Sequence, residues 1–244
     1  MKKLIIIFSI LFFSKSLFAQ AVFISKGKIE FEKRTNVWVQ LEGSFADELK
    51  KSIPEYKTSY FDYVFDGNKA IYKPGRESND KQSPFFSMPA NDNIVYSDFK
   101  TDKYIAEKHV FEKTFLIEDS LRNAKWKIKN DFREIAGFNC RRATTIIMDS
   151  VFVVAFYTDE ITVPGGPESF NGLPGTILGL VINRLHTTWY ATKVEANSVD
   201  EKEITPPQPF RGNKISEEKL KEELKKLMAD WGKYGQRNMW NIMI

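Results

Sequence analysis

Short β-prone segments follow one another along most of this chain, and the gaps between them are too short to hold a helix. Residues 60–65 are aromatic and β-branched, Asp66-Gly67-Asn68 supplies a tight turn, and residues 69–72 resume the pattern, which is typical of a β-hairpin. Parallel strands would need crossover connections of about a dozen residues or more. The sequence therefore predicts a mainly β (α+β) fold built on a curved antiparallel meander sheet.

The other strands are expected wherever β-branched and aromatic residues recur between turn signals. Lys100-Thr101-Asp102 is expected to join one pair of strands, and Asp149-Ser150 another. These strands are predicted at 28–34, 93–99, 103–110, 114–117, 126–128, 140–148, 151–158, 176–183 and 187–195. Residues 73–90 are rich in Gly, Pro, Ser and Asn, which predicts a mobile loop.

Two segments have the periodicity of helices. A short N-terminal helix is predicted over residues 44–53, where Phe45, Leu49 and Ile53 fall on one face. A C-terminal amphipathic helix is predicted to begin after Ser216, a residue type that caps helix N-termini, with two glutamates in its first turn. Its apolar stripe comprises Leu220, Leu224, Leu227, Met228 and Trp231.

Residues 1–19 have the organisation of a secretory signal peptide. A basic start precedes an apolar stretch from Leu4 to Phe13, and Ala19 provides the small residue before the expected cleavage point. No cysteine stands at that cleavage point, where Gln20 follows Ala19, so a lipid-anchored product is not expected. No later segment is apolar for long enough to span a membrane. The sequence thus predicts a periplasmic or secreted protein in which residues 20–244 form a single domain.

The charge balance argues against a nucleic acid as the partner. The chain has 36 Lys and Arg residues and 32 Asp and Glu residues. Loss of Lys2, Lys3 and Lys15 with the signal peptide would leave 33 basic residues against 32 acidic ones. Nucleic-acid binding depends on a strong basic bias, which this composition lacks.

Two of the expected strands are apolar on both faces. Residues 151–157 and 177–182 are almost entirely apolar, whereas a strand with one face in water should alternate. The second face must then be covered by the curl of the sheet, by the loop at 73–90, or by a ligand or partner. A site for an apolar ligand and a thick core account equally well for this pattern.

The glycines of the stretch GGPESFNGLPG, residues 165–175, lack the chemistry of a nucleotide site. A P-loop needs a lysine and a Ser or Thr after its last glycine, and Gly175 is followed by Thr176-Ile177. A dinucleotide fingerprint opens a helix, whereas a strand is expected here. No glycine lies two residues to either side of Ser169, which excludes the nucleophile elbow of hydrolases.

The same stretch is well suited to a series of rigid turns. Pro174 presets φ at the second position of a type II turn, and Gly175 supplies the positive φ required at the third. The residues of this structural motif are Gly166, Pro167, Asn171, Gly172, Leu173, Pro174 and Gly175. Glu168 and Ser169 are expected to tolerate substitution if their side chains are exposed.

The Cys, His and Met residues do not form a recognisable catalytic or metal-binding motif in the sequence. Cys140 is the only cysteine, so it is predicted to be a buried free thiol on a strand. His109 and His186 are too few for a zinc site. Met239 and Met243 lie one helical turn apart and would suit a soft metal such as Cu(I), but apolar packing is the favoured interpretation. No catalytic residue, metal or cofactor is predicted.

Residues 172–177, Gly-Leu-Pro-Gly-Thr-Ile, closely resemble the signature of the GLPGLI family, also called the Porph_ging domain. Thr176 replaces the usual leucine and Phe156 a common tryptophan, and both still suit strands. Further segments follow in the family's order along nearly the whole chain: residues 27–29, 126–128, 135–144 and 156–158, with Gly166, Pro167 and Phe170.

The resemblance implies an exported accessory protein of Gram-negative, Bacteroidetes-type bacteria, with a layout like that of lipoprotein-carrier proteins. It carries over no catalytic residues. We therefore expect a non-catalytic binding or accessory module for an apolar ligand or an outer-membrane partner. The alternatives are a periplasmic enzyme, such as a hydrolase, and a soft-metal-binding protein.

Overall fold

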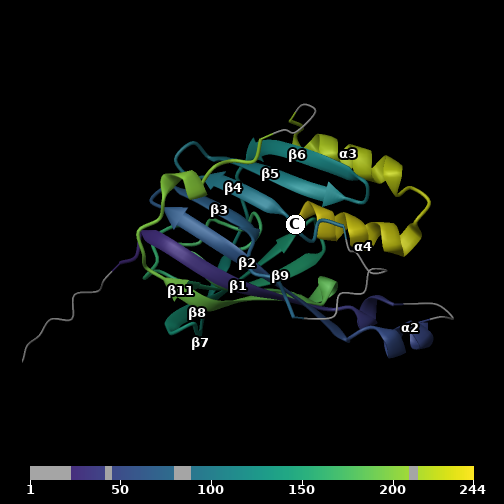
Figure 1. Cartoon of the computed structure of the whole chain (residues 1–244), viewed down its shortest axis with the longest axis horizontal. Coiled ribbons are helices and arrows are strands. Elements are labelled where there is room, and N and C mark those ends of the chain that lie inside the picture. The colour runs from purple at the N-terminus through teal and green to yellow at the C-terminus, as the bar shows by residue number, and fades with distance from the viewer. Residues whose placement is uncertain (1–22, 42–45, 80–88, 209–213) are drawn as a thin grey trace, which may run out of the picture.

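The computed structural model of the chain describes residues 23–41, 46–79, 89–208 and 214–244. The signal peptide expected at 1–19 lies outside these residues. Within them, one 11-stranded sheet has the order β6-β5-β4-β3-β2-β1-β11-β10-β9-β8-β7, and its neighbouring strands are antiparallel (Figure 1). The prediction of a mainly β, antiparallel fold is confirmed. In the described ranges no helix combines the length and apolar character of a membrane span.

Two meanders make up the sheet. The first contains β1 (Lys26–Asn36), β2 (Tyr56–Asp66), β3 (Lys69–Pro74), β4 (Ile94–Asp98), β5 (Lys103–Val110) and β6 (Lys113–Ser120). The second contains β7 (Lys127–Ile135), β8 (Phe138–Ile147), β9 (Val151–Thr158), β10 (Thr176–Ile182) and β11 (Thr187–Glu195). The helices are α2 (Ala46–Ser52), α3 (Glu217–Leu227) and α4 (Gly232–Met243), with short 3-10 helices at Trp38–Gln40, Asn183–Leu185 and Glu201–Glu203.

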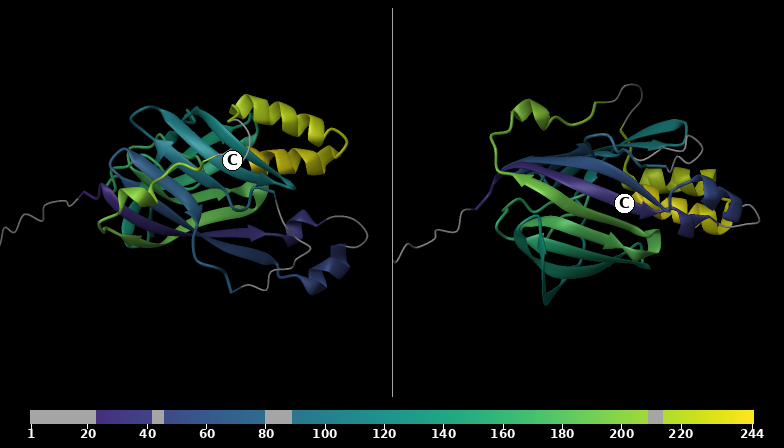
Figure 2. Two further views of the ribbon diagram at one scale, coloured as in Figure 1. Left: turned by 45° about the horizontal axis from the view of Figure 1, so that its top comes forward. Right: turned by 60° about the horizontal axis from the view of Figure 1, so that its bottom comes forward.

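The pairing of β1 with β11 joins the two meanders, from Lys28 opposite Glu195 to Thr35 opposite Thr187. Figure 2 shows the sheet bent so that its two halves lie in different planes, with α3 and α4 at one end. Side chains of both halves share one core, which includes Phe31 on β1 and Leu180 on β10, each 0% exposed. In strands such as β1 and β5 alternate residues point into this core, as expected for sheets with one wet face.

The expectation of burial on both faces is wrong for β9. Its inward-facing residues, such as Val153, are fully buried, but Phe152 on the other face is 47% exposed. Ile146, which pairs with Phe152 from β8, is 63% exposed. In β10 a bulge between Ile177 and Gly179 adds a residue to the strand and breaks its alternation. The buried run of β10 is nearly continuous, because the bulge shifts the alternation and the side chains of Ile135 and Tyr190 cover Gly179.

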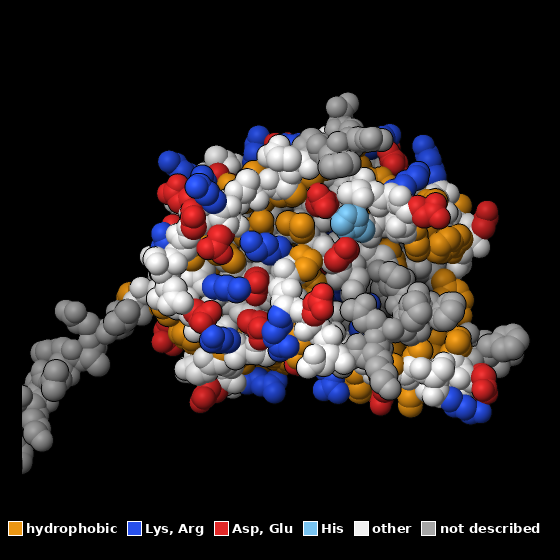
Figure 3. Space-filling model, in the orientation of Figure 1, with side chains coloured by type: hydrophobic (Ala, Val, Ile, Leu, Met, Phe, Trp, Pro, Cys, Tyr) orange, Lys and Arg blue, Asp and Glu red, His pale blue; other side chains and the backbone are white. Residues whose placement is uncertain are grey.

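The C-terminal helix differs in part from its prediction. Ser216 does cap α3, since its hydroxyl accepts a hydrogen bond from the Lys219 N–H, but the helix ends at Leu227. Gly232, with φ of +54°, begins the separate helix α4, which the sequence pattern did not predict. Because of this break, Leu227 and Trp231 leave the buried stripe and are 41% and 42% exposed. Figure 3 shows hydrophobic side chains at the surface at this end of the molecule.

Other differences concern the ends of elements. The strand expected at 126–128 extends to Ile135 and turns at Ala136-Gly137, where both residues have positive φ. The turn after β8 uses Met148-Asp149, one residue earlier than expected. In α2, Leu49 is 44% exposed, so the helix buries little of its expected face. Phe45 of that face and residues 80–88 of the loop expected at 73–90 lie outside the described residues.

Candidate functional site

The glycine-rich stretch between β9 and β10 lies inside the molecule. Phe170 and Leu173 are 1% and 2% exposed. The Gly172 N–H donates to the Pro164 carbonyl at 3.2 Å, and a buried loop needs such partners because unpaired backbone groups are costly to bury. The stretch therefore fills part of the interior with its own side chains.

Two glycines of this stretch have backbone conformations that favour glycine. Gly172 has φ of +86° and Gly175 has φ of +135°. The Gly175 N–H donates to the Leu173 carbonyl at 2.8 Å, so the turn is tighter than the predicted type II turn, whose hydrogen bond spans one more residue. A Cβ atom at Gly175 would also collide with the carbonyl oxygen of Thr158. Both the conformation and the close approach to β9 therefore require glycine at position 175.

The loop carries a charged residue into the core. Glu168 has φ of +55°, and its side chain is 1% exposed. Its carboxylate accepts hydrogen bonds from Lys33 Nζ at 3.2 Å and from Asn93 Nδ2 at 2.8 Å. The Ser169 hydroxyl, also buried, donates to the Ile244 carbonyl at 3.1 Å. The condition under which Glu168 and Ser169 would tolerate substitution, exposure to solvent, is therefore not met.

Further polar groups surround this ion pair. Lys108 of β5 is buried and donates from Nζ to the Ile242 carbonyl at 2.7 Å, and burial lowers the pKa of its ammonium group to about 8. Tyr72 accepts a hydrogen bond from Trp189 Nε1 at 3.2 Å, and burial raises the pKa of the Tyr72 hydroxyl. The cavity beside Glu168 has a volume of only 20 Å³, room for roughly one water molecule. This cluster therefore holds the fold together and offers no space for a ligand.

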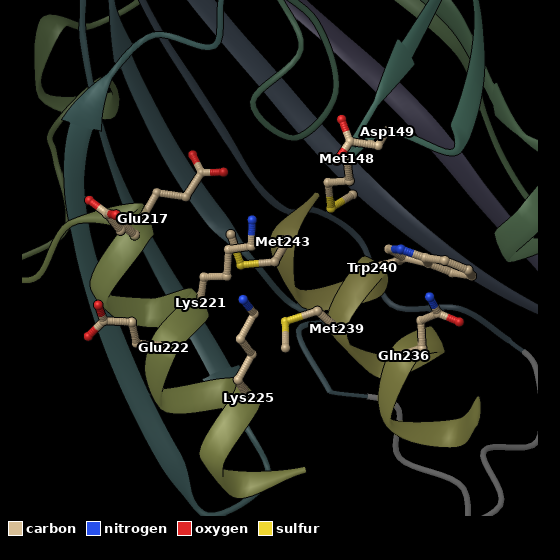
Figure 4. Close-up of a pocket in the computed structure, with 11 residues that line it drawn as sticks. Met148, Asp149, Glu217, Lys221, Glu222, Lys225, Gln236, Met239, Trp240 and Met243 are labelled. Carbon is tan, nitrogen blue, oxygen red and sulfur yellow. The ribbon is translucent and has the colours of Figure 1, made fainter. Parts of the chain in front are cut away.

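An open cleft lies elsewhere, between α3, α4 and the turn that joins β8 to β9 (Figure 4). Its volume is about 590 Å³, which falls within the range of roughly 300–1,000 Å³ typical of small-molecule sites. It is lined by Met148, Asp149, Glu217, Glu218, Lys221, Glu222, Lys225, Gln236, Met239, Trp240 and Met243.

Three methionines give the cleft an apolar floor. Met239 and Met243 come from α4, and Met148 faces them from the hairpin turn (Figure 4). Met148 has φ of +47°, although it is not glycine. Such a conformation costs roughly 1–2 kcal/mol for a residue with a side chain. Trp240 also lines the cleft, and the Arg184 guanidinium lies 4.8 Å from the centre of its ring.

The charged side chains around the cleft are of both signs. Glu217 accepts a hydrogen bond from the Tyr104 hydroxyl at 3.0 Å and lies 3.5 Å from Arg122. In the described part of the chain, Lys221 and Lys225 have no carboxylate within ion-pair distance. The two lysines are one helical turn apart, so their ammonium groups repel each other by a few tenths of a kcal/mol. The cleft thus combines an apolar floor with free hydrogen-bond donors and acceptors.

The other residues considered from the sequence lie apart from the cleft. Cys140 on β8 is buried, and burial raises the pKa of its thiol to about 12. His109 bonds Asp92 through Nδ1 at 2.9 Å, and His186 lies at the end of the 3-10 helix Asn183–Leu185. Among the described residues, no group of three or more His, Cys, Asp or Glu side chains has the arrangement of a metal site.

Comparisons with known proteins give a consistent result. Residues 77–215 match the family described as "N-glycanase peptide, N-terminal domain". The structure of PNGF-II in space group P21 has a TM-score of 0.54 to this chain, with 14% identity over 81% of it. The structure of PNGF-II in space group C2 has a TM-score of 0.50, with 16% identity over 78% of this chain. This chain spans 32% and 30% of the length of those two chains. No curated protein matches the chain.

The family match contradicts the resemblance to the GLPGLI family, and the membership expected from residues 172–177 is wrong. The physical reason lies in the kind of residue that forms the motif. Gly172 and Gly175 have positive φ, and proline presets φ at position 174. A short run of glycine and proline reflects the local conformation of the backbone. Because unrelated families can share such a conformation, the motif does not identify the family.

Proposed function

The chain belongs to the family of N-glycanase N-terminal domains, and from this premise we propose that it is a non-catalytic accessory module that binds N-linked glycoproteins. The match to this family is the observation that carries the proposal. PNGF-II shares only the fold at this level of identity, and this chain spans about a third of it, so the activity of the whole protein is not transferred. Export from the cell, suggested by residues 1–19, is part of the proposal.

The character of the cleft supports a binding role. Among the described residues, its lining includes no Ser, Thr, Cys, His or Tyr side chain that would act as a nucleophile or neutral base. The Glu217 carboxylate is already engaged by Tyr104 and Arg122. An active site needs several converging groups with matched roles, and the described residues of the cleft do not provide such a set.

Of the two interpretations that the strand pattern left open, the packing of the interior supports a thick core over a site for an apolar ligand. Phe170 and Leu173 of the β9–β10 loop, together with Ile242 of α4, fill the core between the halves of the sheet, and each is at most 2% exposed. A ligand would have to displace this packing. We therefore propose that the ligand is polar and binds at the surface.

Ribonuclease B and ribonuclease A provide a direct test, because they share one polypeptide and only ribonuclease B carries an N-linked glycan. Immobilised protein is expected to retain ribonuclease B and not ribonuclease A. Mass spectrometry of the eluted ribonuclease B should find its glycan intact. Equal retention of both proteins would contradict glycan binding, and release of the glycan would show that the module is an enzyme.

A further inference from the structure

We propose that the cleft between α3, α4 and the β8–β9 turn is a carbohydrate-binding site that takes the sugar residues of N-linked glycans. This inference rests on the proposed function and assigns it to a place on the molecule. The cleft is open to solvent and has a volume of about 590 Å³. A sugar residue presents an apolar C–H face and a rim of hydroxyl groups, so its site must offer both kinds of surface.

The floor and one wall of the cleft provide the apolar surface. Met148, Met239 and Met243 approach from opposite sides (Figure 4), and Trp240 adds an aromatic ring. Thioether side chains are polarisable and adapt to irregular shapes, which suits the uneven face of a sugar and the methyl group of an N-acetyl substituent. Indole rings have a large apolar surface and a polar N–H.

The rim of the cleft provides both hydrogen-bond donors and hydrogen-bond acceptors. Sugar hydroxyls donate and accept at once, so a site with donors alone or acceptors alone would leave half of them unsatisfied. Lys221 and Lys225 donate, the Asp149 and Glu218 carboxylates accept, and the Gln236 amide does both. The two lysines have no carboxylate within ion-pair distance among the described residues, so their donors are available to a ligand.

The backbone at Met148 gives a second, independent indication. Met148 and Asp149 both have positive φ, +47° and +62°, in the three-residue turn 148–150 between the paired residues Ile147 and Val151. Met148 and Asp149 adopt this conformation, and the side chains of both line the cleft. A strained backbone conformation persists only where the surrounding structure holds it in place, and such residues cluster at functional sites.

A soft metal is the less suitable occupant of the same cleft. Three thioethers favour Cu(I), but the Lys221 and Lys225 ammonium groups project from α3 toward the same space (Figure 4). Two positive charges beside the thioethers would oppose the binding of a cation. They do not oppose a neutral sugar, whose hydroxyl oxygens accept hydrogen bonds from them.

Substitution of Met148 by asparagine tests the site, and its expected result cannot arise from unfolding of the variant. Asparagine tolerates the left-handed conformation, so Met148→Asn is expected to raise the unfolding temperature slightly. The same variant should weaken binding of ribonuclease B about tenfold or more, because the floor of the cleft loses a side chain. A variant that is more stable and binds less well separates a site residue from a structural one.

Neighbouring lysines on α3 supply a matched control. Lys225 lines the cleft, whereas Lys226, the next residue, does not, and both are exposed. Lys225→Ala should raise the dissociation constant for ribonuclease B severalfold, and Lys226→Ala should leave it unchanged. Trp240→Ala and Trp231→Ala form a second pair, since Trp231 lies outside the cleft lining.

The outcomes distinguish the site from the function. If the unmodified protein binds ribonuclease B and the Met148, Lys225 and Trp240 variants bind it equally well, the cleft is not the site, while the proposed function stands. If the unmodified protein retains neither ribonuclease, or both equally, the proposed function fails and the site assignment falls with it.

Discussion

Lys33 of β1 and Glu168 of the β9–β10 loop form an ion pair at 3.2 Å, and their side chains are 11% and 1% exposed. The two residues are 135 positions apart in the sequence. The Lys33 ammonium also lies 5.1 Å from the centre of the Trp189 ring. The pair ties the loop to the strand at which the two halves of the sheet meet.

Loss of the Glu168 charge should therefore be strongly destabilising. Glu168→Ala leaves Lys33 buried without its counter-ion, and breaking a buried pair in this way costs about 3–5 kcal/mol. Chemical denaturation monitored by tryptophan fluorescence measures the change. Glu112→Ala, at an exposed position, is the control and should alter stability by no more than about 0.5 kcal/mol. Similar small effects for both variants would show that the pair is dispensable.

Gly175 is expected to tolerate alanine far less well than Gly137. Both have positive φ, but a Cβ atom at Gly137 would meet no atom within 4 Å, whereas at Gly175 it would collide with the Thr158 carbonyl. Gly137→Ala should cost about 1 kcal/mol, the penalty of the backbone conformation alone. Gly175→Ala should cost several times more, as read from unfolding midpoints. Equal costs would mean that the loop relaxes away from β9.

Lys108 should make stability depend on pH. Its pKa is about 8 in the folded protein, against an ordinary value of 10.5, so between these values the unfolded state binds more protons. Stability then rises with pH through this window, by about 3 kcal/mol in total for a full 2.5-unit difference. Lys108→Met should abolish this contribution.

The pH test compares the two proteins at each pH, because other groups titrate nearby. Burial raises the pKa of Cys140 to about 12 and also raises that of Tyr63, and both oppose Lys108 at high pH. These contributions cancel in the difference between wild type and Lys108→Met. A difference in unfolding free energy that stays constant from pH 7 to pH 10 would contradict the assignment.

Thiol labelling examines the environment of Cys140. The thiol is buried and its pKa is raised to about 12, so little thiolate exists at pH 7–8, and thiolate is the reactive form. Reaction with a maleimide should be slow in the native protein and fast in denaturant. Rapid labelling under native conditions would place Cys140 at an accessible, activated position.

The sequence predicts the sheet well because its signals are local. The Asp66-Gly67-Asn68 turn is followed by β3 at Lys69, since turn formers and alternating side chains act over a few residues. The sequence does not predict the break between α3 and α4, because the apolar spacing continues to Met228 and Trp231, past the end of α3 at Leu227. The periodicity of apolar residues alone does not show where a helix ends.

The cleft was only half visible in the sequence. Met239 and Met243 stand one helical turn apart, a spacing that the sequence itself shows. Met148 joins them only because the sheet bends and carries the β8–β9 turn to the helices, and no local pattern encodes that approach. The burial of Glu168 is not predictable locally for a similar reason, because its partners Lys33 and Asn93 lie far from it in the sequence.

Hydrogen–deuterium exchange with and without ribonuclease B, followed by mass spectrometry, tests most directly whether the cleft is where this module meets its ligand. If it is, ribonuclease B should slow exchange in the turn at Met148-Asp149 and in α3 and α4, and ribonuclease A should have no effect there. Protection confined instead to the exposed apolar face around Ile146 and Phe152, which are 63% and 47% exposed, or no difference between the two ribonucleases, would contradict it.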